Sequence, residues 1–147
     1  MAKARIYLLP AARNTVVDNG EAGVAINPAI NPGALADLEE LGSSPGFMDK
    51  LIGAFVADNG TLLAKMESAL SRRDVGEFRI HVHAMRSSAA SMGAERLTAY
   101  CRDVGRLTDA EIKVQGLLLL KSLRGELATT RDALDRYLQG RRRKSVG

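Results

Sequence analysis

Apolar residues recur every three or four positions over most of this chain after residue 30, which is the spacing of amphipathic α-helices. A first short helix is expected to begin with Asn31 as its cap and Pro32 in its first position, and to end at Gly42. The next pattern keeps its register through Asn59-Gly60, so we expect a single long helix there. Its apolar positions are Met48, Ile52, Phe55, Val56, Leu62, Leu63, Met66 and Leu70.

A third helix carries both histidines of the chain. Asp74 is in position to cap its first turn, with Glu77 three residues later as the partner of a capping box. Gly93 follows the last apolar position, where a left-handed residue often ends a helix. The apolar stripe of this helix consists of Val75, Phe78, Val82, Met85, Ala89 and Met92.

Two more helices are expected after Gly93. The apolar face of the first consists of Leu97, Tyr100, Cys101, Val104 and Leu107. Thr108-Asp109 breaks this pattern, and a leucine-rich helix follows, with weak points at Gly116 and Gly125 and a stop at Gly140. No alternating strand pattern of useful length is present. We therefore predict an all-α fold, an antiparallel up-down four-helix bundle with a short extra N-terminal helix.

The two ends of the chain lie outside this helical pattern. Residues 1–30 show no sustained period and are predicted to be a flexible N-terminal arm or linker. We assign residues 31–140 to the bundle and residues 141–147 to a basic C-terminal tail. The four positive charges from Arg141 to Lys144 account for the whole formal net charge of +4. Positive and negative side chains are therefore equal in number in the rest of the chain. Such a terminal run usually forms a frayed, solvated end, and a tether to nucleic acid or anionic lipid is the weaker alternative.

Composition narrows the class of protein further. With 147 residues, of which 46% are hydrophobic and 26% charged, the chain is suited to one compact core. No stretch approaches the roughly 20 apolar residues that span a bilayer, so membrane insertion is not expected. No nucleic-acid-binding motif is evident. A single cysteine, Cys101, falls on an apolar stripe and agrees with a buried thiol and a cytoplasmic location.

His83 lies off the apolar stripe of its helix. It points roughly 140° from the centre of that stripe, so its imidazole must face solvent or a partner. Arg79 and Arg86 flank it, and the rest of its face is small or apolar where long charged side chains would be usual. The small or apolar positions are Gly76, Ile80, Ser87, Ala90 and Ser91. This arrangement indicates a nucleophile that is offered to another macromolecule.

His81 and His83 do not form a metal site. Residues two apart on a helix point roughly 200° from each other, so the two rings cannot bind one ion. His81 falls at the margin of the core stripe, where we expect a packed or hydrogen-bonded side chain. We predict no metal ligand in this chain.

The segment that begins at His83 resembles the motif of the histidine-containing phosphotransfer (Hpt) domain family. That motif is a histidine followed three and four positions later by a lysine and a glycine, then small residues and a Gly-Ala pair. Here arginine replaces the lysine and serine replaces the glycine. The matching positions are His83, Arg86, Ser87, Ala89, Ala90, Gly93 and Ala94. With the apolar pattern upstream and downstream, the resemblance takes in roughly residues 34 to 138.

The resemblance implies a function in a two-component phosphorelay. His83 would accept a phosphoryl group from an aspartate of a receiver domain and pass it to another receiver, and Arg86 would stabilise the charge of the phosphate. The partners implied are response-regulator receiver domains and a hybrid sensor histidine kinase. Residues that would contact the receiver are Arg79, Ile80, Ser87, Ala90 and Ser91.

The sequence itself lacks the remaining parts of a phosphoryl-transfer enzyme. It contains no Gly-rich phosphate loop and no evident cluster of carboxylates to hold Mg²⁺ beside His83. We therefore expect a phosphocarrier with no ATP-dependent kinase activity and no cofactor of its own, with Mg²⁺ on the partner receiver. The alternative is a regulatory module that binds a receiver or another protein without being phosphorylated. An adaptor that works through its basic tail is the weakest of the three.

Overall fold

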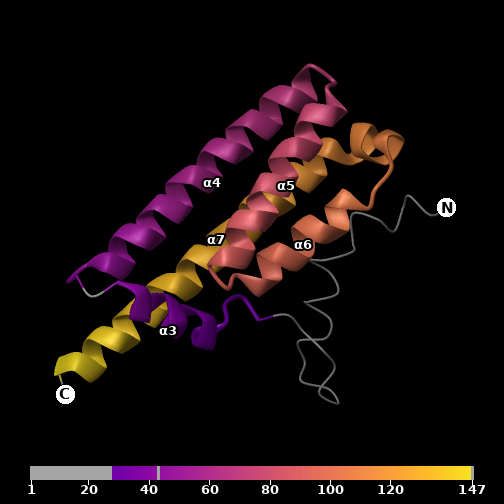
Figure 1. Ribbon diagram of the computed structural model, residues 1–147. Helices are drawn as coiled ribbons and strands as arrows, with labels where there is room; N and C mark the ends of the chain where they lie inside the picture. The colour runs from indigo at the N-terminus through magenta and orange to yellow at the C-terminus, as the bar shows by residue number, and fades with distance from the viewer. Residues whose placement is uncertain (1–27, 43, 147) are drawn as a thin grey trace, which may run out of the picture.

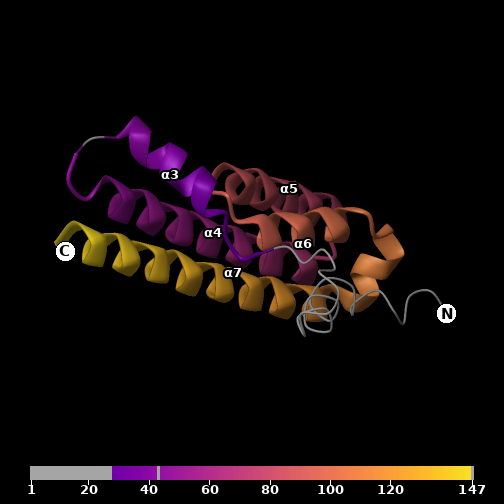
Figure 2. The same ribbon diagram turned by 90° about the horizontal axis from the view of Figure 1, so that it is seen from below.

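The computed structural model describes the backbone of residues 28–42 and 44–146 and, within these, the side chains up to Arg141. The predicted arm at residues 1–30 therefore lies almost wholly outside the described residues. Helices in the described part are α3 (Pro32–Leu41), α4 (Phe47–Ser71), α5 (Val75–Ser91), α6 (Glu95–Gly105) and α7 (Asp109–Val146). The four long helices run alternately up and down, and α3 lies at one end of the bundle (Figures 1 and 2). The predicted all-α four-helix bundle with a short N-terminal helix is confirmed.

The order of the helices around the core follows their order in the chain. Helix α4 packs against α5 and α7, and α6 packs against α5 and α7. The contact between α5 and α6 therefore lies on the opposite side of the bundle from the contact between α4 and α7. The core contains fully buried side chains from every helix, among them Leu35, Met66, Phe78, Met85, Leu97, Ile112, Leu123 and Leu134.

Most of the predicted helix ends are confirmed. The Asn31 side chain accepts a hydrogen bond from the Ala34 amide at 3.1 Å, and Asp74 accepts one from the Glu77 amide at 3.0 Å. Each cap satisfies an amide that has no partner within its own helix. Helix α4 is unbroken through Asn59, as predicted. The break after α6 is also where predicted, because Thr108 caps the first turn of α7 through a hydrogen bond from the Glu111 amide at 3.1 Å.

The predicted stop at Gly140 is wrong. Helix α7 continues through this residue to Val146. A glycine in an exposed helix costs only about 1 kcal/mol, and the arginines and lysine that follow are good helix formers. Two contacts with α3 hold this part of α7, since Tyr137 donates a hydrogen bond to Glu39 at 2.6 Å and Arg141 pairs with the same carboxylate at 3.2 Å.

Two glycines allow close approaches that the bundle requires. Gly93 has a φ of 71° in the turn between α5 and α6, and a Cβ atom there would lie 2.8 Å from Cβ of Ala34. Its carbonyl accepts the Asn31 amide at 2.8 Å, which anchors the start of α3 to this turn. A Cβ on Gly116 would lie 2.8 Å from Leu70, so this glycine brings α7 against α4. The predicted weak point at Gly116 is therefore a packing contact.

A buried ion pair joins α6 to α7. Arg96 approaches the carboxylate of Glu126 to 2.9 Å, and the Glu126 side chain is only 5% exposed. Among the described residues, neither the Arg96 Nε nor the Glu126 Oε1 has a partner in hydrogen-bond geometry, although the two atoms lie 2.9 Å apart. Burial raises the pKa of Glu126, and the charge of Arg96 opposes that change.

The raised pKa of Glu126 predicts a pH dependence of stability. The folded chain binds a proton at this site more readily than the unfolded chain, so the stabilising contribution is present below the ordinary carboxyl pKa of 4.5 and is lost as the pH rises through the folded value. We expect the free energy of unfolding of the native chain to fall relative to that of Glu126→Gln as the pH rises above 4.5. Urea titrations at a series of pH values measure this difference, and a difference that stays constant with pH would contradict the assignment.

Candidate functional site

The imidazole of His83 stands clear of the core, as predicted. Its neighbour Val82 is 3% exposed and Met85 is fully buried, whereas His83 is exposed. Within the described part of the chain the ring makes no hydrogen bond or ion pair. The helical periodicity of α5 produces this contrast, because successive residues turn by about 100°. The residue is therefore exposed on the solvent side of α5.

The face of α5 around His83 consists of small and exposed side chains. Ser87, Ala90 and Ser91 are all exposed, and the Ser91 hydroxyl donates to the Ser87 carbonyl at 3.1 Å. Ile80 is 66% exposed, which leaves an apolar side chain in water one turn before the histidine. The predicted uncrowded surface is thus present. The contact of these residues with a receiver remains a prediction.

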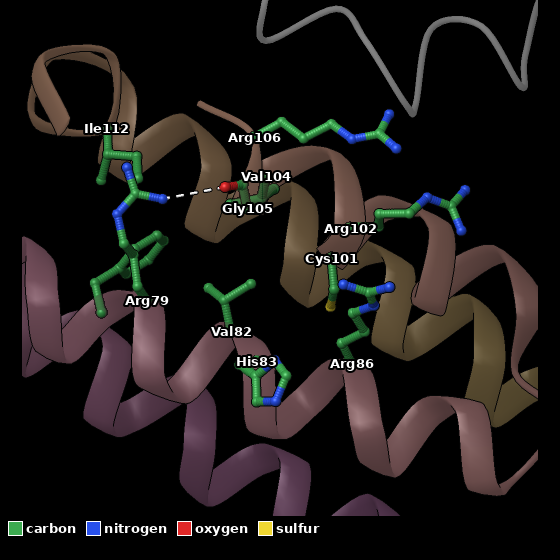
Figure 3. Close-up of a pocket in the computed structure, with 11 residues that line it drawn as sticks. Arg79, Val82, His83, Arg86, Cys101, Arg102, Val104, Gly105, Arg106 and Ile112 are labelled. Carbon is green, nitrogen blue, oxygen red and sulfur yellow. Dashed lines mark hydrogen bonds between the residues drawn. The ribbon is translucent and has the colours of Figure 1, made fainter. Parts of the chain in front are cut away.

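Arg79 does not lie free beside the imidazole. Its guanidinium donates to the carbonyls of Gly105 at 3.2 Å and Leu107 at 2.6 Å, and to the carboxylate of Asp109 at 2.8 and 3.0 Å. The bond to Gly105 is drawn in Figure 3. Arg79 therefore ties α5 to the turn between α6 and α7. The sequence pattern did not reveal this role, because the acceptors lie 26 to 30 residues away in the chain.

A cavity of about 380 Å³ opens beside His83, between α5 and α6. Arginines dominate its polar lining, and among the residues that the structure describes no aspartate or glutamate lines it. Figure 3 shows Arg86 reaching from α5 toward α6, with its guanidinium beside Cys101. The described residues that line the cavity are Phe78, Arg79, Val82, His83, Arg86, Cys101, Arg102, Val104, Gly105, Arg106 and Ile112.

Cys101 lies at the bottom of this cavity without being reactive. Burial raises the pKa of its thiol to about 12, and the positive charge of Arg86 opposes the shift only in part. The thiol is therefore protonated at neutral pH and is a poor nucleophile. The predicted burial of Cys101 is confirmed, since it is 1% exposed.

His81 is packed and hydrogen-bonded, as predicted. Its side chain is 14% exposed, and its Nε2 atom lies 3.2 Å from the carboxylate of Glu77 one turn earlier. Hydrogen bonds from Arg72 and His81 hold the pKa of Glu77 below its ordinary value. Among the described residues, no group of three or more histidine, cysteine, aspartate or glutamate side chains is placed to hold a metal ion.

The sequence pattern did not reveal a polar contact in the core behind the site. Asn59 of α4 is fully buried and donates to the Phe55 carbonyl at 2.8 Å and to the Ser88 hydroxyl at 3.0 Å. Ser88 lies on α5, five residues after His83, so this bond sets the position of α5 against α4. The sequence did contain an indication of this buried position, because Asn59 lies four residues after Phe55 and therefore on the same core-facing side of the helix.

Among residues 28–42 and 44–146, no helix is both long enough and apolar enough to cross a membrane.

Comparison with known proteins identifies the family. A sequence model of the Hpt domain matches residues 50–140, which is more than half of the chain. Among curated proteins, "pseudo histidine-containing phosphotransfer protein 1" of Oryza sativa subsp. japonica is 27% identical over 100 residues, which cover 66% of this chain and 53% of that protein. The chain thus spans about half the length of this relative.

Two solved structures have a similar fold. Histidine-containing phosphotransfer protein B from Pseudomonas aeruginosa PAO1 has a TM-score of 0.64 at 23% identity, over 76% of this chain and 96% of that one. A candidate histidine-containing phosphotransfer protein from rice has a TM-score of 0.66 at 18% identity, over 90% of this chain and 96% of that one. The family match over residues 50–140 shows that this chain belongs to the Hpt domain family, and the two solved structures share its helical-bundle fold.

Proposed function

We propose that this chain is a histidine phosphotransfer protein that accepts a phosphoryl group on His83 from a receiver aspartate and passes it to another receiver. The observation that carries the proposal is the exposed, unbonded imidazole on a face of small side chains. A folded partner can bring its own active site into contact with such a ring. The direction of transfer depends on which receiver is phosphorylated first.

The proposed transfer exchanges one bond to phosphorus for another. A lone pair on a neutral ring nitrogen of His83 attacks the phosphorus in line with the P–O bond of the aspartyl phosphate. The P–N bond forms as the P–O bond breaks, and the aspartate carboxylate leaves with the electron pair. The proton on the other ring nitrogen stays on the ring or passes to solvent. Transfer to a second receiver reverses these steps.

Arg86 is proposed to stabilise the phosphate on His83. It lies three residues after the histidine, so both side chains share one side of α5. Arg86 is exposed and, in the described part of the chain, makes no hydrogen bond or ion pair. Its planar guanidinium can donate two parallel hydrogen bonds to a phosphate, where a lysine acts as a point charge. We expect this difference to affect the lifetime of the phosphohistidine.

The other parts of the reaction are proposed to come from the partners. Response-regulator receivers would provide the aspartate and its Mg²⁺, and a hybrid sensor histidine kinase would provide the phosphoryl groups from ATP. We propose no cofactor and no metal for this chain, and a cytoplasmic location. Ile80, Ser87, Ala90 and Ser91 are the proposed contacts with the receiver.

A second candidate function is a regulatory module that binds receivers without being phosphorylated. The departures at Arg86 and Ser87 support it, and so does the word "pseudo" in the name of the rice relative. The two functions share a docking surface and differ in whether a covalent bond to phosphorus forms.

Labelling by phosphorylated receivers tests the proposal. The purified chain is mixed with a panel of receivers carrying ³²P on their aspartates, and transferred label is followed over time. We expect label that is labile in acid and stable in base, as a phosphorus–nitrogen bond requires. Binding to a receiver with no transfer of label would instead support the regulatory module.

The small side chain at Ser87 is predicted to be needed for transfer. Ser87 lies one turn after His83 and is exposed, so Ser87→Gln adds a longer neutral side chain without disturbing the core. We expect the rate of transfer from a receiver to fall by at least about tenfold, because small displacements of reacting groups have large effects on rate. Ser68→Gln, the same change at an exposed position of α4, is the control and should leave the rate unchanged. Equal rates for both variants would show that Ser87 is not at the interface.

A further inference from the structure

The cavity beside His83 carries an excess of positive charge. In the described part of the chain, four arginines and no acidic residue line it. Arg79 is paired with Asp109 at 2.8 Å, and Arg106 approaches Asp103 at 3.7 Å with 72% of its side chain exposed. Arg102 has no hydrogen bond or ion pair within the described residues, and the same holds for Arg86.

This charge is local and does not reflect a generally basic protein. The formal net charge is +4, and the run from Arg141 to Lys144 supplies four positive charges, which leaves zero for the rest of the chain. Two unpaired arginines, Arg86 and Arg102, on a body without net charge create a positive field at one seam of the bundle. Arg102 comes from α6 and Arg106 is the residue that caps its C-terminal end, whereas His83 and Arg86 come from α5.

The chemistry of the proposed phosphoryl donor is complementary to this cluster. An aspartyl phosphate is an anion, and the Mg²⁺ beside it is held by carboxylates, so the donor surface around the phosphoryl group is acidic. The cavity opens beside the imidazole that must meet this group. Charges at the edge of an interface mainly control the association rate and the choice of partner.

We infer that Arg102, with Arg106, forms a docking site at the C-terminal end of α6 for acidic side chains that surround the phosphorylated aspartate of the receiver. This inference rests on the proposed function and extends it to a second helix. Contacts on α5 alone leave the receiver free to rotate about His83. A cationic contact on α6 fixes that rotation, and it favours receivers whose acidic residues lie at the matching position.

Charge reversal at Arg102 tests this inference. The donor is the receiver that labels the native chain fastest in the panel described above. For Arg102→Glu we expect the apparent KM for this phosphorylated receiver to rise by about tenfold, a typical size for a lost steering charge, with the maximal rate of transfer little changed. The double variant with Arg106→Glu should show a larger effect. Arg102→Lys keeps the charge and should restore most of the affinity.

Two controls separate docking from chemistry and from folding. Phosphoramidate, a small phosphoryl donor with no docking surface, should label Arg102→Glu as fast as the native chain. Lys121→Glu makes the same charge change at an exposed position of α7 that does not line the cavity, and should leave KM unchanged. The affinity of the native chain for the receiver should also fall more steeply with salt than that of Arg102→Glu.

Different experimental results would overturn the docking site and the proposed phosphotransfer function. An unchanged KM for Arg102→Glu, or an equal rise for Lys121→Glu, would overturn the docking site and leave the proposed function intact. Slow labelling of Arg102→Glu by phosphoramidate would also overturn it, because the residue would then act on folding or chemistry. Absence of label on the native chain from every receiver and from phosphoramidate would overturn the proposed function, and the docking site with it.

Discussion

Replacing His83 with glutamine is expected to reduce labelling by phosphorylated receivers to background. Glutamine is neutral, similar in length and a good helix former, so α5 should be unaffected. Its amide nitrogen has no available lone pair, and the variant therefore cannot form the P–N bond. Autoradiography of the mixed proteins, with circular dichroism to verify the helical content, measures this result.

His81→Gln is the matched control for this experiment. It makes the same change two residues earlier in the same helix, at a side chain that is mostly buried and bonded to Glu77. We expect its labelling to stay close to that of the native chain. Full labelling of His83→Gln would place the phosphoacceptor elsewhere. Loss of labelling in both variants, with folding intact, would show that the effect is not specific to the exposed imidazole.

Truncation of Phe78 to alanine is expected to lower the free energy of unfolding by about 3–5 kcal/mol, as for other large aromatic side chains in protein cores. Phe78 is fully buried and lies on the core stripe of α5, so its removal leaves a cavity between helices. A domain of this size is stable by about 5–15 kcal/mol, so the loss is a large fraction of the total. Urea denaturation followed by circular dichroism measures the difference.

Ile80→Ala is the matched control on the same helix. Ile80 is 66% exposed, and we expect its truncation to change stability by less than about 0.5 kcal/mol. The same variant should weaken docking if Ile80 contacts the receiver. Equal loss of stability in the two variants would contradict the core-facing direction of Phe78, and with it the orientation that places His83 in solvent.

The sequence was sufficient to predict the helices and the orientation of the histidine. Helical periodicity and capping residues are local properties, and the structure confirms the caps at Asn31 and Asp74 and the unbroken helix through Asn59. The exposure of His83 also follows from periodicity, because the stripe that includes Val82 and Met85 must face the core. The stop predicted at Gly140 was wrong because the helix penalty of one glycine is small beside contacts with a distant helix.

The partners of the charged side chains were decided only by the tertiary structure. Arg79 and Arg86 both flank His83 in the sequence pattern, yet Arg79 is bound to the turn between α6 and α7 while Arg86 is not bonded within the described residues. Arg102 and the capping residue Arg106 join the site because α6 packs beside α5. Helical periodicity determines which way a side chain points, whereas its partner depends on which other helix is brought within a few ångströms, and the packing of the whole bundle determines that.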